Sequence, residues 1–370
     1  MRVLVVCSDA DIGGAERFLV SLASARREED RIALVVLMSP GALSPQLEGA
    51  FDEVTYLKFA PSSRNLPGMI RALERAVVAF QPDVVSSHLF HADLVTALAK
   101  IRVPRTSTVH TQRLSSDDHP LTRVIARAVG LLSFRFAAVI PASASSQMSE
   151  FLSSLHMRNV VAAIPNAGSV PAAPRFSRTA RRFLSLARNH PVKGHRRLFQ
   201  AFAEIAAELP EWTLVAHGPG VTADDPAMAS AIEEARVAHL LESGRIQLAG
   251  PTNQPEHALA HASALVISSI YGEAFPIVGV EAAGLGIPVI TTDLGSCAEF
   301  ADDPRFLVPP NDVEALAQAM RNYASADDKE RARLSALARA RAEAEYDPQI
   351  AYERYRALFT NLLDAKAKRS

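Results

Sequence analysis

Short apolar runs alternate with longer segments of helical periodicity along almost the whole chain, and this alternation most constrains the fold. Strands that pair in parallel need a crossover connection, usually a helix, and are buried on both faces. The pattern therefore predicts an α/β fold with parallel, doubly wound sheets. We expect one series of strands at residues 2–7, 31–38, 53–59, 83–88, 105–110, 137–142 and 160–164, and a second at residues 183–187, 212–217, 246–249, 264–269, 288–292 and 306–309.

The length of the chain and a break between the two series predict two domains. The 370 residues are too many for one small core and suit two α/β domains. Residues 169–177 contain two prolines and follow neither period, which is typical of a linker. We therefore place an N-terminal domain at residues 1–170 and a C-terminal domain at residues 171–349. Residues 350–363 form a last amphipathic helical pattern.

Composition excludes several classes of protein. A formal net charge of -1 excludes a generally basic nucleic-acid binder. The two cysteines, Cys7 and Cys297, form neither a metal-ligand cluster nor a disulfide framework, which favours a reducing, cytoplasmic location. The chain starts directly with an expected strand, so we expect no secretion signal. The most apolar run, residues 128–142, is shorter than a membrane span and contains Arg135, so we expect no transmembrane helix.

Two carboxylates, Glu273 and Glu281, lie eight positions apart and flank an apolar loop that leads into a helical pattern. If a helix begins near Ile277, its free N–H groups and positive dipole end face the loop, which suits a phosphate or a sugar oxygen. Glu281 then lies about one turn inside the helix, and Glu273 lies at the mouth of the loop. The pair is typical of a clamp for a nucleotide-linked ligand. The alternative, that Glu281 is merely a charge in the first helical turn, stays open.

Two cations follow the first strand of the second series. Arg188 ends an apolar run, and Lys193 lies in the loop before a helical pattern at residues 195–208. The guanidinium offers a rigid fork to two phosphate oxygens, whereas the ammonium is a mobile point charge. Together they predict a diphosphate clamp, although each taken alone is more often a solvated side chain.

The loop after the first strand contains both glycines and carboxylates. Gly13 and Gly14 precede a helical pattern at residues 16–25, so their backbone can approach a phosphate at a helix N-terminus. The spacing does not match the dinucleotide fingerprint, and a tight turn without a ligand is the alternative. Asp9 and Asp11 imitate a D-x-D metal motif, but a loop or capping role is favoured over metal binding.

The histidines of the first series fall into two groups. His88, after Ser87, and His91 are three positions apart and lack a third metal ligand nearby, which favours structural or acceptor-side roles. His110 ends a predicted parallel strand, at the edge where open α/β sheets bind ligands. Asn166 is either a turn residue or part of a ligand site.

Nine motifs in this order resemble those of the retaining glycosyltransferases of family GT4, and the resemblance spans nearly the whole chain. They are Gly-Gly-Ala-Glu at 13–16, Ser-His-Leu-Phe-His-Ala-Asp at 87–93, Thr-Val-His-Thr at 108–111, Val-Ile-Pro-Ala-Ser at 139–143, Ile-Pro-Asn-Ala at 164–167, the Arg188 and Lys193 pair, His-Gly-Pro-Gly at 217–220, the Glu273 and Glu281 pair, and Gly-Ile-Pro-Val-Ile-Thr-Thr at 286–292.

The resemblance implies the GT-B fold, in which two Rossmann-like, doubly wound parallel-sheet domains face a central cleft. It implies an acceptor-side N-terminal domain, a nucleotide-sugar donor domain, and a final segment at about 350–370 that packs back on the first domain. The implied reaction moves a hexosyl or N-acetylhexosaminyl group, with retention, from a nucleoside diphosphate sugar to a lipid-linked or growing glycan. The sequences of two motifs resemble those of bacterial enzymes of capsule, exopolysaccharide, lipopolysaccharide and O-antigen synthesis. This resemblance makes a UDP-sugar the first donor candidate and GDP-mannose the second. The family picture needs no metal or other cofactor.

The resemblance also implies residue roles. It assigns sugar contact to His110 and Glu273, ribose contact to Glu281, and stabilisation of the leaving diphosphate to Arg188 and Lys193. The implied donor-binding set is Gly14, Arg188, Lys193, Phe275, Pro276, Ile277, Val278 and Glu281. Two departures leave the sugar open: Ile277 stands where relatives often have asparagine, and His217 where many have glycine.

Three alternatives remain. A nucleotide-sugar epimerase of the same fold would use the same donor site without an acceptor. An NAD-linked oxidoreductase would need the missing glycine fingerprint. A sugar-binding protein without catalysis would not need all four charged residues of the two pairs.

A basic segment in the first half of the chain suggests a membrane surface as a further partner. Between Lys100 and Arg135 there are seven basic residues against two acidic ones, Asp117 and Asp118. Residues 121–136 interleave arginines with large apolar residues. The segment fits either peripheral docking on the inner face of the plasma membrane or a helix packed on the sheet with its arginines in water.

Overall fold

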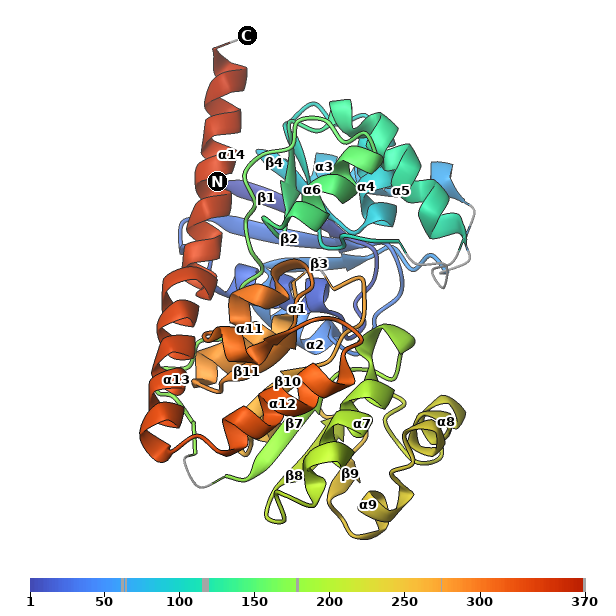
Figure 1. Ribbon diagram of the computed structural model, residues 1–370. Coiled ribbons are helices and arrows are strands. Elements are labelled where there is room, and N and C mark those ends of the chain that lie inside the picture. Colours follow the sequence, from blue (N-terminus) through green and yellow to red (C-terminus); the bar gives the residue numbers. More distant parts are fainter. Residues whose placement is uncertain (61–62, 64, 115–119, 178–179, 274, 369–370) are drawn as a thin grey trace. The chain divides into compact units, whose positions relative to one another are not determined.

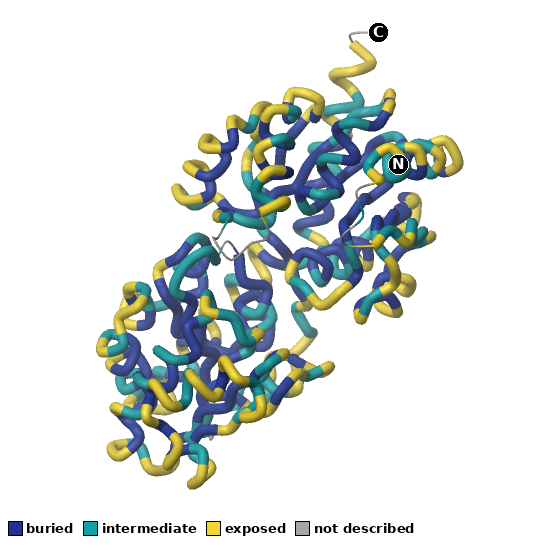
Figure 2. Tube along the Cα trace, turned by 90° about the vertical axis from the view of Figure 1, so that its right-hand side faces the viewer, coloured by how far each residue is buried: buried dark blue, intermediate teal, exposed yellow. Residues whose placement is uncertain are grey.

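The computed structural model (Figure 1) describes residues 1–370 except 61–62, 64, 115–119, 178–179, 274 and 369–370. The chain divides into two compact units. Unit 1 comprises Met1–Gly168 and Glu345–Ser370, and unit 2 comprises Ser169–Ala344. Each unit has its own buried centre, as the colours of Figure 2 show.

Unit 1 contains a six-stranded parallel sheet in the order β3-β2-β1-β4-β5-β6. The strand order reverses between β1 and β4, which makes this the point where ligands bind in open α/β sheets. The strands are β1 (Arg2–Cys7), β2 (Arg31–Val36), β3 (Glu53–Tyr56), β4 (Val84–His88), β5 (Arg105–Val109) and β6 (Ala138–Pro141).

The strand expected at residues 160–164 is wrong. This segment follows the edge of β6, and Val160 forms only an isolated bridge with Val139. Val161 N donates to Val139 O, and Ile164 N donates to Pro141 O. Three residues of the segment thus pass two residues of β6, and the extra residue interrupts the ladder as a bulge does.

Helices flank the sheet of unit 1. They are α1 (Gly14–Ser24), α2 (Ser44–Ala50), α3 (Leu66–Phe80), α4 (Phe90–Leu98), α5 (Pro120–Leu132), the 3₁₀ turn η1 (Ser133–Arg135), α6 (Ser146–Ser154) and α14 (Pro348–Ala367). The last of these, α14, packs against α1 and buries Tyr352, Tyr355 and Phe359. The buried Asp30 carboxylate joins both ends of the chain, because it accepts bonds from the Met1 amine (2.7 Å) and the Tyr352 hydroxyl (2.6 Å).

Unit 2 contains a second six-stranded parallel sheet, in the order β12-β11-β10-β7-β8-β9. Its order reverses between β7 and β10. The strands are β7 (Arg182–Leu186), β8 (Thr213–His217), β9 (Ile246–Leu248), β10 (Ala264–Ile267), β11 (Val289–Thr292) and β12 (Leu307–Val308). The helices are α7 (His195–Ala206), α8 (Pro226–Ala235), α9 (Ala238–Glu242), α10 (Pro255–Ala260), α11 (Ile277–Leu285), α12 (Val313–Ala324) and α13 (Asp328–Arg341), with 3₁₀ turns η2 (Pro191–Lys193), η3 (Gly295–Phe300) and η4 (Pro304–Phe306). The π-helical turn η5 (Ala342–Tyr346) begins in unit 2 and ends in unit 1.

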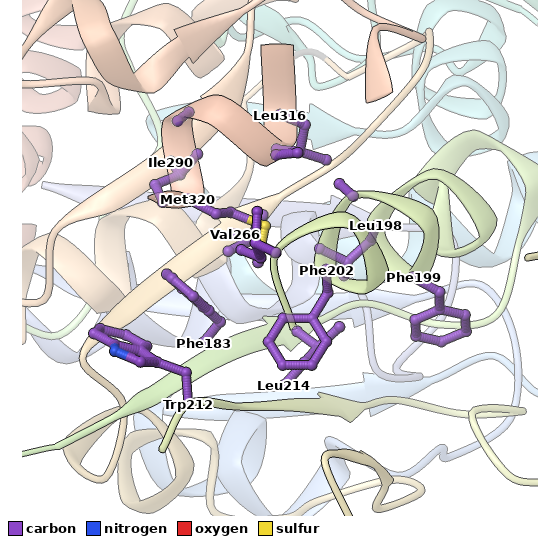
Figure 3. Close-up of a cluster of buried hydrophobic side chains, with 14 of the residues drawn as sticks. Phe183, Leu198, Phe199, Phe202, Trp212, Leu214, Val266, Ile290, Leu316 and Met320 are labelled. Atoms are coloured by element: carbon purple, nitrogen blue, oxygen red, sulfur yellow. The ribbon is translucent and has the colours of Figure 1, made fainter. Parts of the chain in front are cut away.

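The core of unit 2 lies between its sheet and the helices α7 and α12 (Figure 3). Phe183 on β7 stacks on Trp212 with ring centroids 4.5 Å apart, and Tyr323 of α12 meets Trp212 edge-on. Aromatic pairs at such distances add to the free energy gained by burying their area. This packing fixes β7 at the centre of the sheet, and thereby positions the loop that follows it.

The prediction of two parallel, doubly wound sheets is confirmed. Among the described residues, no helix combines the length and the apolar character needed to cross a bilayer.

Candidate functional site

The two loops that follow β7 and β10 lie side by side at the reversal point of unit 2. Ile270 N donates to Val192 O (2.8 Å), and Ser268 Oγ donates to Lys193 O (2.8 Å). Gly194, which follows η2, has a φ of 67°, and a Cβ there would lie 2.1 Å from Ser268 O. Only glycine allows both this backbone conformation and this approach, so Gly194 lets the two loops join.

The joined loops bring Lys193 and Glu273 together. Lys193 Nζ lies 2.5 Å from Glu273 Oε2, and Ser269 Oγ donates to the same carboxylate oxygen at 2.7 Å. The side chains are 24% and 11% exposed, so the pair is largely withdrawn from water. Thr292, at the end of β11, donates to Ser269 O (2.8 Å) and holds that residue in place.

The charge state of Glu273 follows from these contacts. Burial of the carboxyl favours its neutral form, but the charge of Lys193, the bonds from Lys193 and Ser269, and the charge of Arg188 outweigh burial and lower the pKa of Glu273. Glu273 is therefore an anion at neutral pH. Arg188, just beyond β7, is exposed.

The helix expected to begin near Ile277 begins at Ile277. Its N-cap, Pro276, has no side-chain bond to the first turn. Gly279 N donates to Pro276 O (2.9 Å), whereas the amides of Ile277 and Val278 precede the first intrahelical bond, as expected of a helix N-terminus. The predicted phosphate contact thus rests on the amides of Ile277 and Val278.

The side chains of the predicted donor loop are mostly buried. Phe275 packs edge-on against Phe300 at 5.4 Å, and Pro276 and Ile277 are buried as well. Phe275 and Ile277 would contribute to a ligand site through their backbone N–H groups, whereas Pro276 has no N–H to donate. Glu281 lies within α11, one turn beyond its start, and is half-buried. Ala274 of the same loop lies outside the described residues.

His217 ends β8, and its contacts are structural. Its Nδ1 lies 3.3 Å from Gly250 O, and Gly218 N donates to the same carbonyl at 2.8 Å. The departure from glycine at this position therefore places an imidazole against the neighbouring loop.

His195, the first residue of α7, is a buried histidine that sequence reasoning did not single out. It is 4% exposed, and neither ring nitrogen has a hydrogen-bond partner in the described part of the chain. Burial and the nearby Lys193 charge lower the pKa of His195 to about 4. The imidazole is therefore neutral at physiological pH.

In unit 1, His110 belongs to a hydrogen-bonded chain at the ends of β4 and β5. His110 Nδ1 lies 3.1 Å from Asn166 Oδ1, and His110 Nε2 lies 2.9 Å from His88 Nδ1. Ser86 Oγ lies 3.3 Å from His88 Nε2. The two imidazoles are stacked, with centroids 5.3 Å apart, and Phe18 lies 5.6 Å from His110.

The hydrogen-bond partners of the two histidines fix which atom donates in each of these bonds. The oxygen of Asn166 only accepts, so His110 donates from Nδ1 and accepts at Nε2 from His88 Nδ1. His88 Nε2 then accepts from Ser86. Burial lowers the pKa of His110 to about 4 and holds the pKa of His88 well below its usual value, so both rings are neutral. Both nitrogens of His110 are thus engaged within unit 1, and contact with a sugar would require the ring to exchange a partner.

The predicted glycine loop of unit 1 lies at the N-terminus of α1, with Gly13 as N-cap. A Cβ at Gly13 would lie 2.1 Å from Glu16 Oε2, so the Glu16 carboxyl folds back over this glycine. Burial, together with the charge of Asp9, raises the pKa of Glu16 to about 7. Gly14 is the first residue of α1, where backbone N–H groups have no intrahelical partner.

Asp9, Asp11 and Ser87, three further polar residues singled out in the sequence of unit 1, have local partners. Asp11 N donates to Asp9 Oδ1 (3.2 Å), and Ala42 N donates to Asp11 Oδ1 (3.4 Å). Ser87 donates to Asp93 Oδ1 (2.6 Å). Among the described residues, no three His, Cys, Asp or Glu side chains are grouped so as to hold a metal ion.

Sequence reasoning named Asn166 but missed Ser269, Thr292 and Ser86, which also hold predicted site residues in place. Ser269 and Thr292 steady Glu273, and Ser86 and Asn166 orient the histidines. Ser269 and Thr292 are polar residues at the ends of predicted strands, so a signal for them was available, whereas Ser86 lies inside the strand predicted at residues 83–88.

Two protein-family models match the chain. The model described as glycosyltransferase family 4 matches residues 12–167, and the model described as glycosyl transferases group 1 matches residues 171–341. The first therefore lies within unit 1 and the second within unit 2.

Three similar proteins illustrate the range of relatives. An exopolysaccharide phosphotransferase of Streptomyces coelicolor is 33% identical over 168 residues, which are 43% of this chain and only 17% of that protein. A glycogen synthase of Mycobacterium tuberculosis is 27% identical over an alignment that covers 94% of this chain and 92% of that protein. The crystal structure of Anabaena HepE in complex with UDP is 20% identical, covers 98% of this chain and 100% of HepE, and has a TM-score of 0.80. Together with the two parallel sheets, these matches show that the chain belongs to the GT4-type glycosyltransferases of the GT-B fold.

Proposed function

We propose that this chain transfers a sugar, with retention of anomeric configuration, from a nucleoside diphosphate sugar to a lipid-linked or growing polysaccharide acceptor. One observation carries the proposal. Lys193, Arg188 and Glu273 gather at the reversal point of the unit 2 sheet, where open α/β sheets bind nucleotides. The free amides at the start of α11 follow the same loop.

The proposed chemistry is stabilisation of a leaving diphosphate by fixed charge. As the bond from the sugar to the diphosphate breaks, negative charge grows on the phosphate oxygens. This negative charge is stabilised by the cations Lys193 and Arg188 and by the amides of Ile277 and Val278. These groups need little movement to do so, and such preorganised charge is the most effective form of electrostatic catalysis. Glu281 holds the ribose, and Glu273 addresses the transferred sugar. We assign the acceptor to unit 1, with His110 as its sugar-contacting residue.

The first donor candidate is a UDP-sugar. HepE was solved with UDP and with UDP-glucose, and this supports uridine as the base. GDP-mannose remains the second candidate. The exopolysaccharide name of the Streptomyces relative favours a surface polysaccharide as the product. Retention rests on family membership alone, because the arrangement of these residues does not fix the stereochemical outcome.

A donor screen followed by product analysis tests the proposal. UDP-glucose, UDP-galactose, UDP-N-acetylglucosamine and GDP-mannose are first compared by the shift that each causes in the thermal unfolding temperature. The stabilising donor is then incubated with lipid-linked glycan acceptors, and the new linkage is assigned by NMR. An α-linked donor should give an α-linked product. An inverted product would overturn retention, and conversion of the donor into an epimeric nucleotide sugar without an acceptor would favour an epimerase.

A further inference from the structure

The outward face of α5 carries an unusual concentration of exposed apolar side chains. Leu121, Val124 and Leu131 on α5 and Phe134 on η1 are 44%, 60%, 70% and 56% exposed. The other large apolar side chains that are exposed among the described residues lie singly on separate segments: Ile12, Val78, Val160 and Leu337. Scattered apolar residues are normal on a surface, whereas a gathered group marks an interaction site.

The group follows helical geometry. Val124 and Leu131 are seven residues apart, so they lie one above the other, two turns apart, on the same face of α5. The opposite face, with Ile125, Ala126 and Val129, is buried, and α5 packs against α4 (Figure 1). This helix is therefore apolar on two faces, one of which faces solvent. We name Leu121, Val124, Leu131 and Phe134 the α5 stripe.

The charged residues on α5 and η1 and at the contact of η1 with residue 158 are, in the described part of the chain, all arginines. Arg123 and Arg127 lie four residues apart along one border of the stripe, and Arg127 is exposed. Arg158 N donates to Ser133 Oγ (2.8 Å), which brings a further exposed arginine next to η1. Residues 120–136 contain three arginines and no Asp or Glu. Asp117 and Asp118 lie outside the described residues.

Two of the arginines counted in the sequence have structural roles. Arg105 donates to the carbonyls of Thr96, Ala97 and Ala99 at the end of α4, and Arg135 also donates to Ala97 O. Both neutralise the negative end of that helix. Arg123 and Arg127 have no such carbonyl partner in the described part of the chain. They are the arginines left for an external partner.

We propose that the α5 stripe docks unit 1 on the surface of an anionic lipid bilayer. The apolar side chains would enter the boundary between headgroups and acyl chains, while Arg123, Arg127 and Arg158 contact acidic headgroups. A second copy of this chain fits less well, because a symmetric contact through the same face would bring two sets of arginines together. The inference stands independently of the donor site of unit 2, and its test needs no catalytic activity.

Flotation of the full chain with lipid vesicles tests the proposal. Binding to vesicles of phosphatidylglycerol and phosphatidylcholine should exceed binding to phosphatidylcholine alone and should fall as salt rises, because salt screens exposed charges. Arg123→Gln and Arg127→Gln should each weaken binding about fivefold. The double variant Val124→Ser, Leu131→Ser should weaken it at least about tenfold, including at low salt.

Matched controls lie on another helix of the same unit. Val78 on α3 is 75% exposed, and Arg75 on that helix is exposed as well. Val78→Ser and Arg75→Gln should leave vesicle binding unchanged, and circular dichroism should show every variant folded. Equal binding to neutral and anionic vesicles, or unchanged binding of the α5 variants, would overturn the proposal. So would self-association without vesicles, measured by sedimentation, that disappears in the Val124→Ser, Leu131→Ser variant.

Discussion

The ammonium of Lys193 lies 2.5 Å from the carboxylate of Glu273, although the two residues are 80 positions apart in the chain. The contact exists because β10 pairs directly with β7, so the loops after these strands share one edge of the sheet. The two charges hold each other in a partly buried place. A phosphate that approaches Lys193 therefore meets a cation whose carboxylate partner already competes for it.

Removing either cation of the clamp should slow turnover. Lys193→Ala and Arg188→Ala are each expected to lower kcat at least about tenfold, because each removes charge stabilisation of the leaving diphosphate, an effect of order a few kcal/mol. Arg196→Ala is the matched control, since Arg196 pairs with Glu234 on the surface of the same unit. Wild-type kcat in both clamp variants, measured by release of nucleoside diphosphate, would refute the clamp.

The two glutamates should differ in their response to the bare nucleotide. Glu281→Gln is expected to weaken both nucleoside diphosphate and intact donor, because a ribose contact is present in both. Glu273→Gln should bind the bare nucleoside diphosphate at least as tightly as the wild type, because Lys193 loses a competing carboxylate, and should lower turnover or change sugar preference. Calorimetry with both ligands decides between the roles. Equal weakening of the bare nucleotide by both variants would show that the assignment is wrong.

Local signals sufficed for much of the fold. Pro276 followed by an apolar helical run places the start of α11 at Ile277, and Gly286, with a φ of 74°, ends that helix. The strands expected from the sequence are the strands of the two observed sheets, except at residues 160–164. There a bulge along the edge of β6 leaves a single bridge, between Val160 and Val139. A bulge depends on the neighbouring strand, so the apolar character of the segment could not reveal it.

The sequence pattern could not predict which residues bond to each other across a sheet. His88 and His110 were each recognised as polar residues at strand ends, but their bond depends on β4 lying next to β5 in one register. The pairing of Lys193 with Glu273 likewise depends on the strand order of unit 2. Spacing along a chain identifies which residues lie at a sheet edge, whereas strand order decides which of them meet.

Activity should survive removal of divalent metal ions. We assign the stabilisation of charge on the leaving diphosphate to Lys193, Arg188 and helix-end amides. EDTA is therefore expected to leave kcat within about twofold of its value without EDTA. Asp9→Asn and Asp11→Asn should then show no change in their response to EDTA. Complete loss of activity on chelation, restored by manganese in the wild type but not in these variants, would assign a metal-binding role to this loop.

His195 should make unit 2 sensitive to acid. Its pKa in the folded chain is about 4, whereas an unfolded histidine has a pKa of about 6.5, so the unfolded state takes up the proton first. The free energy of unfolding should therefore be fully retained above about pH 6.5 and fall by about 2 kcal/mol as the pH reaches about 5.

Trp212, the one tryptophan of the chain, reports unfolding of this unit by its fluorescence. His195→Leu should remove the loss, because it replaces two unpaired ring nitrogens with apolar atoms. The exposed His239→Leu is the control, and the same acid sensitivity in His195→Leu as in the wild type would place its origin elsewhere.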